Sequence, residues 1–512
     1  MDCKSFSELR ELIRRYNSTS VLEIGSQKCW QKWQTLYSTP DDWLHGNTKR
    51  NYAIRLMLLA SAGNPYRHND ISVKEFESLI DAYYKLDEHT ISDTRILDQE
   101  SESILSCIKK WESDKEKITR NWSFKLSEIL DLEVIRTDVP FLFLQRLVAF
   151  QNAGFGYPFS RICRTIKIIE LLDKNSDNEF SNDFLKNAKL SNINYFKQFL
   201  VCLLVFDDSY KKKGFFDFSQ LPRIDELETK GITTKEGLQL FINQNSEFFI
   251  SKKENSLRQI INQTLNSVPD FYQPFFYNHF LETPIIKLDQ ENFCLPDPVS
   301  FTESCWNQVR SLVFSESNRK ELEKLLSRSF ENYLKHTLLP LIAPKSFEKI
   351  SEVKNSSSRE DKRADFLIET SNSYIVLECK CSIMSADTSA YFQADKLADL
   401  WCRIHSASEQ IGATVKALNL CDKPVIPLIL TFYDSLAASS VFEKMIKQTN
   451  YCSRMSLNMP PILRSLHEFE HQIYNRSLNN WTELILSEQN NVQPDNKGHN
   501  YEHLSDISIL AL

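Results

Sequence analysis

At 512 residues the chain is too long for one ordinary hydrophobic core, so its length predicts two or three domains. Hydrophobic residues make up 42% and charged residues 25%, a balance that excludes a mainly disordered protein. The formal net charge of −7 argues against a protein that coats nucleic acid non-specifically, although a local basic groove can steer a ligand on an acidic chain.

The cysteines and the apolar runs indicate the compartment. Twelve cysteines are scattered without a CxxC pair, which fits neither a zinc ribbon nor a disulfide framework. The first residues lack the apolar run of a signal peptide, and the longest apolar stretches are too short to cross a bilayer. We therefore expect a cytoplasmic protein with reduced thiols and no membrane partner.

Residues 1–285 are predicted to form a large α-helical domain. Only 10 glycines occur in the chain, which favours helices over a turn-rich β architecture. The segment 141–150 is apolar on nearly all sides and predicts a buried central helix. One segment shows the full i, i+3, i+4, i+7 pattern of an amphipathic helix: Phe76, Leu79, Ile80 and Tyr83.

The pattern changes close to residue 285. Residues 282–298 alternate short apolar pieces with polar turns, which predicts a small β-hairpin or an extended connector. Residues 286–455 then read as a mixed α/β domain. Residues 456–512 are expected to be a C-terminal extension that is partly flexible.

A second hairpin is predicted inside the mixed domain. Two β-rich runs, Ala364–Thr370 and Ser373–Cys381, flank a turn at Ser371 and Asn372. A two-residue loop there pairs Thr370 with Ser373 and fixes the register of the whole ladder.

This register brings charged side chains together. Counting back from the turn places Asp365 opposite Glu378, with Cβ atoms about 5 Å apart. Period-2 alternation places Lys380 on the same face as Glu378. Two carboxylates this close repel each other unless a cation lies between them. Their oxygen atoms are the ligands that Mg²⁺ prefers, and Mn²⁺ could substitute for it. A metal there would stabilise charge on a phosphate and activate a water, and Lys380 would orient that water or stabilise the transition state.

These residues resemble a known family. The pattern Asp365…Glu378-Cys379-Lys380 looks like the Asp…Glu-x-Lys core of PD-(D/E)XK, or restriction-endonuclease-like, phosphodiesterases. The fold class expected from this resemblance is mixed α+β, a large helical N-terminal domain followed by an α-β-β-β-α-β nuclease domain. The elements assigned to that core are helix 318–338, ended by Pro340 and Pro344, strand 347–353, the hairpin, helix 387–418 and strand 424–433.

The resemblance also implies accessory residues. Glu331 stands where many members place a further acidic metal ligand, and Gln410 is a better accessory candidate than Gln393. Lys396 and Arg403 on the same predicted helix would contact phosphate. The chain departs from the family pattern in two ways. It has alanine rather than proline before Asp365, and no tyrosine follows Gln410 at the family's spacing.

The implied function is a Mg²⁺-dependent nuclease. DNA is the expected substrate, an endonuclease is favoured over an exonuclease, and a defence-type effector that works as a homodimer fits by analogy. The helical N-terminal domain would recognise substrate or a partner protein, or restrain the nuclease. An inactive nuclease-fold module that binds nucleic acid or a protein stays open, as does a helical scaffold whose α/β part only dimerises.

Ordinary structural roles compete with these assignments. A second Glu-x-Lys at Glu352 and Lys354 lacks a facing aspartate at hairpin register, so the bare motif alone means little. Glu331 is as compatible with a solvated helix face as with a metal ligand. His405 follows an apolar helical stretch and is interpreted as a structural histidine rather than a base.

Overall fold

The computed structural model divides the chain into two compact units. The first unit comprises Met1–Ser92, Asn152–Arg319 and Ser389–Tyr391, and the second comprises Asp93–Gln151, Lys320–Thr388 and Phe392–Leu512. The structure describes residues 3–35, 47–62, 69–91, 94–116, 124–129, 158–175, 192–210, 216–217, 224–248, 279–315, 319–342, 347–349, 363–381, 394–432, 451–466, 469–470, 473 and 478–489. The units cross the boundaries expected at residues 285 and 455, because segments far apart in sequence pack together.

The first unit is mainly helical, as expected. Its helices are α1 (Phe6–Ile13), α2 (Ser18–Thr35), α4 (Asn47–Ser61), α5 (Val73–Ile91), α9 (Pro158–Asn175), α11 (Asn192–Tyr210), α12 (Ile224–Thr229), α13 (Lys235–Gln244) and α15 (Pro298–Ser315), with a 3-10 turn at His279–Leu281. The predicted amphipathic stripe lies on α5, and its four side chains, Phe76, Leu79, Ile80 and Tyr83, are buried. The segment 141–150 lies outside the described residues.

A small sheet also belongs to the first unit. Strands β1 (Phe216–Asp217), β2 (Ser246–Phe248), β3 (Ile285–Lys287) and β4 (Asn292–Cys294) lie in the order β1-β4-β3-β2. The predicted hairpin in residues 282–298 is confirmed as the antiparallel pair of β3 and β4. The mainly helical residues 1–285 also contribute two short strands, β1 and β2, which join that hairpin. Strands of two or three residues are too short to show a period-2 pattern.

The second unit is built around a five-stranded sheet. Its strands are β5 (Phe347–Lys349), β6 (Phe366–Glu369), β7 (Tyr374–Lys380), β8 (Val425–Thr431) and β9 (Ile462–Ser465), in the order β5-β6-β7-β8-β9. The first three strands pair antiparallel, whereas β7, β8 and β9 pair parallel. The helices are α6 (Thr94–Glu116), α16 (Arg319–Tyr333), α17 (Leu339–Ile342), α19 (Ala394–Leu418), α21 (Tyr451–Arg454) and α23 (Leu478–Gln489), with a 3-10 turn at Leu126–Glu128.

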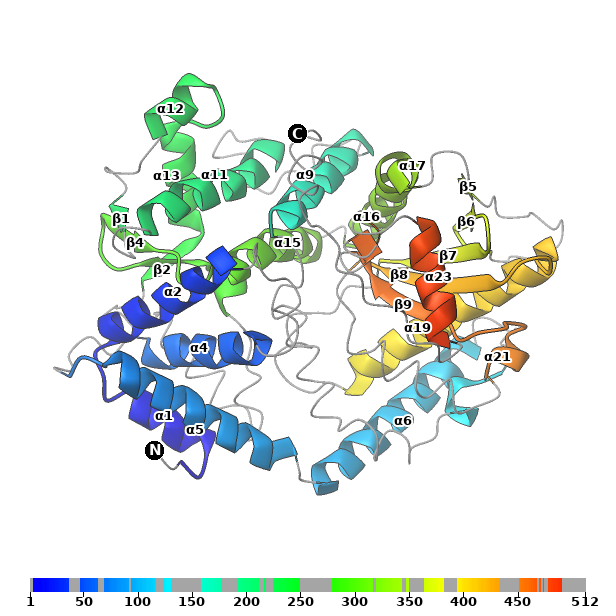
Figure 1. Ribbon diagram of the computed structural model, residues 1–512, viewed down its shortest axis with the longest axis horizontal. Helices are drawn as coiled ribbons and strands as arrows, with labels where there is room; N and C mark the ends of the chain where they lie inside the picture. Colours follow the sequence, from blue (N-terminus) through cyan, green and yellow to red (C-terminus); the bar gives the residue numbers. More distant parts are fainter. Residues whose placement is uncertain are drawn as a thin grey trace. The chain divides into compact units, whose positions relative to one another are not determined.

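Helix α19 connects the parallel strands β7 and β8 and packs on both, and α6 lies along α19 (Figure 1). All seven residues of β8 are buried, as expected for a parallel strand covered on both faces. The order α16, β5, β6, β7, α19, β8 is the order of elements expected from the sequence. Among the described residues, no helix is both long and apolar enough to span a membrane.

Pro340 does not end the helix before it, contrary to the sequence prediction. After α16 the chain forms a π-helical turn at Leu334–Leu338 and continues into α17 through Pro340. Proline lacks an N–H, and its ring crowds the carbonyl four residues earlier, so an ordinary α-helix would break or kink here. The wider π turn is a known way to accommodate such an interruption.

Part of the expected C-terminal extension belongs to the fold. Strand β9 completes the edge of the sheet beside β8, and Thr482 on α23 donates a 3.1 Å hydrogen bond to the Asn372 side chain in the β6–β7 turn. Described residues between 456 and 489 therefore pack on the sheet of the second unit. Residues 490–512 lie outside the described residues.

Candidate active site

The hairpin register predicted from the turn is confirmed. Phe366 pairs with Leu377 and Glu369 with Tyr374, the register that a two-residue turn at Ser371 and Asn372 predicts, and the pairing ends at Phe366. Asp365 itself lies one residue before β6, and its N–H donates a 3.1 Å hydrogen bond to the carbonyl of Leu377, the ladder partner of Phe366. The backbone therefore brings two carboxylates together at the end of adjacent strands.

The Asp365 carboxylate is oriented by the neighbouring strand. Its Oδ2 atom accepts a 2.8 Å hydrogen bond from the backbone N–H of Cys379, the residue between Glu378 and Lys380. A backbone donor fixed in a sheet leaves this carboxylate little rotational freedom. Asp365 is partly buried, so one side of it remains accessible.

Glu378 is the most unusual carboxylate of this cluster. It is only 2% exposed, and burial raises its pKa to about 8, with the charges of Asp365 and Glu331 adding to the rise and Lys380 opposing it. Its Oε1 atom accepts a hydrogen bond from the Lys380 ammonium. Its Oε2 atom is buried and has no hydrogen-bond partner among the described residues. A buried carboxylate oxygen without a donor is costly unless a ligand completes it.

Lys380 lies between a strand and a helix. Its ammonium donates to Glu378 Oε1 and, at 2.6 Å, to the side-chain oxygen of Gln410 on α19. An ammonium has three N–H donors, and the described residues occupy two of them, so the third can serve a substrate or water oxygen. The structure thus brings Gln410, selected from the sequence over Gln393, into direct contact with Lys380. Gln393 itself lies outside the described residues.

A clamp that the sequence did not reveal fastens the start of β6 to the same helical turn. The Thr414 hydroxyl accepts a 2.8 Å hydrogen bond from the N–H of Ala364 and donates one of 2.8 Å to the carbonyl of Gln410. Arg363 adds a 3.0 Å hydrogen bond to the carbonyl of Ala413. The only available signal was the position of Thr414 one turn after Gln410. This clamp holds the strand that carries Asp365 against the helix that positions Lys380.

The remaining candidates are less closely tied to the cluster. Glu331 lies on α16, and its charge acts on Glu378 and contributes to the raised pKa of that residue. Arg403 is half exposed and pairs with Asp399 one turn earlier on α19, at 2.8 Å. The structure therefore gives Arg403 a carboxylate partner outside the cluster. The side chain of Lys396 lies outside the described residues, as does the second Glu-x-Lys at 352–354.

His405 has the structural role predicted for it. Its Nδ1 lies 3.0 Å from the hydroxyl of Tyr451, and its Nε2 lies 3.1 Å from the carbonyl of Phe124. Burial lowers its pKa to about 4, so the ring is neutral near pH 7. A neutral ring with both nitrogens occupied is not placed to act as a base.

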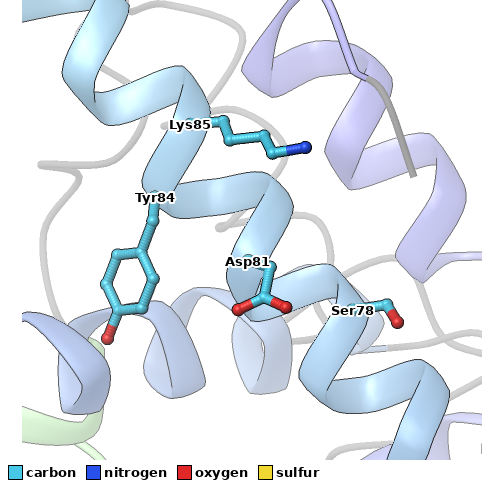
Figure 2. A pocket seen from close by; sticks show the side chains of 4 residues that line it. All are labelled: Ser78, Asp81, Tyr84 and Lys85. Atoms are coloured by element: carbon cyan, nitrogen blue, oxygen red, sulfur yellow. The ribbon is translucent and has the colours of Figure 1, made fainter.

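A surface hollow of about 340 Å³ lies elsewhere, on α5 of the first unit. Figure 2 shows the four side chains that line it projecting from one helix: Ser78, Asp81, Tyr84 and Lys85. Their i, i+3, i+6 and i+7 spacing brings them together on any helix, and their mixed charge does not define a ligand. The hollow carries none of the carboxylates described above.

The donor set of the cluster fits a hard divalent cation. No group of three or more His, Cys, Asp or Glu side chains in a metal-binding arrangement occurs within the described ranges. Mg²⁺, however, is commonly held by one or two carboxylates, with waters and substrate phosphate completing its shell. The buried Oε2 atom of Glu378, beside the oriented Asp365, meets that requirement.

Comparisons with known proteins add no assignment. No protein-family model, no curated protein and no solved structure matches this chain.

Proposed function

We propose that the second unit is a Mg²⁺-dependent phosphodiester hydrolase of the PD-(D/E)XK type that cleaves nucleic acid, with DNA as its expected substrate. The observation that carries this proposal is the cluster at the end of the hairpin, where Asp365 accepts from the Cys379 N–H and Lys380 donates to the buried Glu378. An order of elements that resembles the family core supports it.

Each residue of the cluster has a chemical task in this proposal. Asp365 and Glu378 would hold the metal, with Glu331 as a further acidic group. When bound, Mg²⁺ supplies charge neutralisation at the phosphate and lowers the pKa of a coordinated water. The remaining N–H of Lys380 orients the attacking water or donates to the phosphate as charge develops on it. Gln410 keeps the ammonium aimed at that point through its 2.6 Å hydrogen bond.

A cleavage assay tests the proposal. Circular plasmid, linear duplex DNA and RNA are incubated with the full chain and Mg²⁺ or Mn²⁺, and cleavage of the circle identifies an endonuclease. Removing one transition-state donor typically costs about 100-fold or more in rate, so we expect a loss of this size for Lys380→Ala. Asp365→Ala should also abolish Mn²⁺ binding measured by calorimetry.

Lys423→Ala is the matched control. Lys423 forms a 2.7 Å ion pair with Glu369 on the same sheet, outside the cluster, so its loss removes a similar Lys–Glu pair. This variant should cleave like the wild type. Equal cleavage by Lys380→Ala and wild type would contradict the role of Lys380. Nucleic-acid binding without cleavage under any condition would favour the inactive module instead.

A further inference from the structure

A stripe of positive charge runs along one side of α16. Lys324, Arg328, Glu331 and Lys335 are spaced i, i+4, i+7 and i+11, so they lie within about one-sixth of the helix circumference. The last of them lies in the π turn that continues the helix. We call Lys324, Arg328 and Lys335 the basic stripe.

The cations of the basic stripe are available to a ligand. Lys324 and Arg328 are exposed and Lys335 is half-buried. Within the described ranges none of the three makes an ion pair or a side-chain hydrogen bond.

Several other helices pair their cations internally. Lys167 and Lys174 share Glu170 on α9, and Arg403 pairs with Asp399 on α19. The basic stripe therefore differs from a solvated helix face laced with i, i+4 ion pairs.

The basic stripe lies beside the carboxylate cluster. Glu331, within the same row, is close enough for its charge to raise the pKa of Glu378. The adjacent side of α16 lies near the end of β7, where the Ser327 side chain acts on the thiol of Cys381, the residue after Lys380. A polyanion lying along the stripe would therefore pass the point where Asp365 and Glu378 converge.

We propose that the basic stripe is a binding track for the phosphodiester backbone of the nucleic acid whose cleavage is proposed above, and the inference rests on that function. With a rise of about 1.5 Å per residue, the three cations span roughly 16 Å, a length that covers several consecutive phosphates. Unpaired lysine and arginine side chains bind phosphates by displacing counterions, without reading sequence. The track gives the acidic chain a local positive surface at its catalytic cluster.

Binding is measured by fluorescence anisotropy without divalent metal, so that no cleavage occurs. Labelled duplex DNA, single-stranded DNA and RNA of one sequence are titrated with the full chain across a salt series. The triple variant Lys324→Ala, Arg328→Ala, Lys335→Ala should bind about tenfold or more weakly, and its log Kd against log salt slope should fall by about 2 to 3. The nucleic acid that shows this change is the one the track accepts.

A charge-matched triple variant separates the track from net charge. Lys109 and Lys110 on α6 and Lys416 on α19 are exposed, and their replacement by alanine removes the same three charges. This control should keep the wild-type affinity and salt slope. Thermal unfolding of both variants is compared with the wild type, because the exposed substitutions should alter stability by about 0.5 kcal/mol or less and the half-buried Lys335 is the one that needs this control.

The outcomes for the track and for catalysis are distinct. The track would be overturned if the two triple variants lost affinity equally, or if the stripe variant kept the wild-type slope of log Kd against log salt. It would also be overturned if the full chain bound none of the three nucleic acids. Binding that depends on the stripe, without cleavage when Mg²⁺ is added, would support the track and reject the catalytic proposal. Cleavage with an unchanged KM in the stripe variant would reject the track alone.

Discussion

Asp297 in the first unit and Glu378 in the second are both 2% exposed, and each carboxylate contacts a cation. Asp297 accepts hydrogen bonds from Arg55 and from the Ser300 hydroxyl on one oxygen, and from the Val299 N–H at 3.1 Å on the other. Glu378 accepts from Lys380 on one oxygen, and its second oxygen has no described donor. The two carboxylates are equally buried, but within the described residues only Asp297 has a hydrogen-bond donor on both oxygens.

The difference separates a structural carboxylate from a candidate functional one. Asp297 lies just before α15, where its side chain caps the helix and its carbonyl accepts the first backbone bond, from Phe301. Every donor it needs comes from the fold. Glu378 is held in place by the strand but has no described donor on one oxygen, and burial raises its pKa to about 8. A buried carboxylate oxygen without a donor calls for an explanation, and a bound cation would supply one.

The largest effect on stability is expected from Asp297→Ala. This change removes a helix cap and leaves Arg55 buried, with two Nη atoms that have no other described partner. Breaking a buried pair from one side typically costs about 3–5 kcal/mol. Urea unfolding followed by circular dichroism should show this loss.

Asp297→Asn separates the two contributions. Asparagine keeps an oxygen that can cap α15 but loses the charge opposite Arg55. We expect its stability to fall between those of the wild type and Asp297→Ala. An Asp297→Ala protein as stable as the wild type would show that Arg55 and Asp297 do not form a buried ion pair.

Glu378→Gln should act in the opposite direction on the metal-free protein. The folded pKa of Glu378, about 8, lies above its usual value of 4.5, so the folded state holds the proton more tightly. Wild-type stability should therefore be full below about pH 4.5 and fall as the pH rises towards 8. Glutamine cannot ionise, so the variant should lose this fall and gain on the order of 1–3 kcal/mol at pH 8 relative to wild type.

Unfolding free energies from pH 5 to 9 in EDTA measure this change. Adding Mg²⁺ should then stabilise the wild type at pH 8 but not Glu378→Gln, because the missing carboxylate can no longer hold the cation. A variant less stable than the wild type at every pH would mean that Glu378 is a satisfied structural residue like Asp297.

The Asp365–Glu378 cluster could be predicted from the sequence, whereas the Arg55–Asp297 pair could not, and the reason is physical. Asp365 and Glu378 belong to one hairpin, so a turn position and a period of two were enough to predict that they lie close together. Arg55 and Asp297 are 242 residues apart and meet only through helix packing, which no periodicity encodes. The Thr414 clamp was missed for the same reason, since its partner Ala364 lies 50 residues away. Gln410 was found through family resemblance, and its contact with Lys380 depends on how α19 docks.

Two glycines, one in each unit, are expected to respond differently to the same substitution. A Cβ on Gly412 of α19 would collide with the backbone carbonyl of Met455, whereas one on Gly25 of α2 would lie 2.6 Å from the Leu58 side chain. Backbone cannot move without shifting the segment that leads into β9, so Gly412→Ala should cost about 1–3 kcal/mol.

The Leu58 side chain can rotate, and alanine gains about 1 kcal/mol over glycine within a helix, so Gly25→Ala should be close to neutral. Thermal unfolding of the two variants compares them directly. Because α19 also carries Gln410 and Thr414, Gly412→Ala should lower cleavage as well, whereas Gly25→Ala should leave it unchanged. Equal stability of the two variants would show that the Met455 segment yields as easily as a leucine side chain, and that α19 is less firmly seated than its contacts suggest.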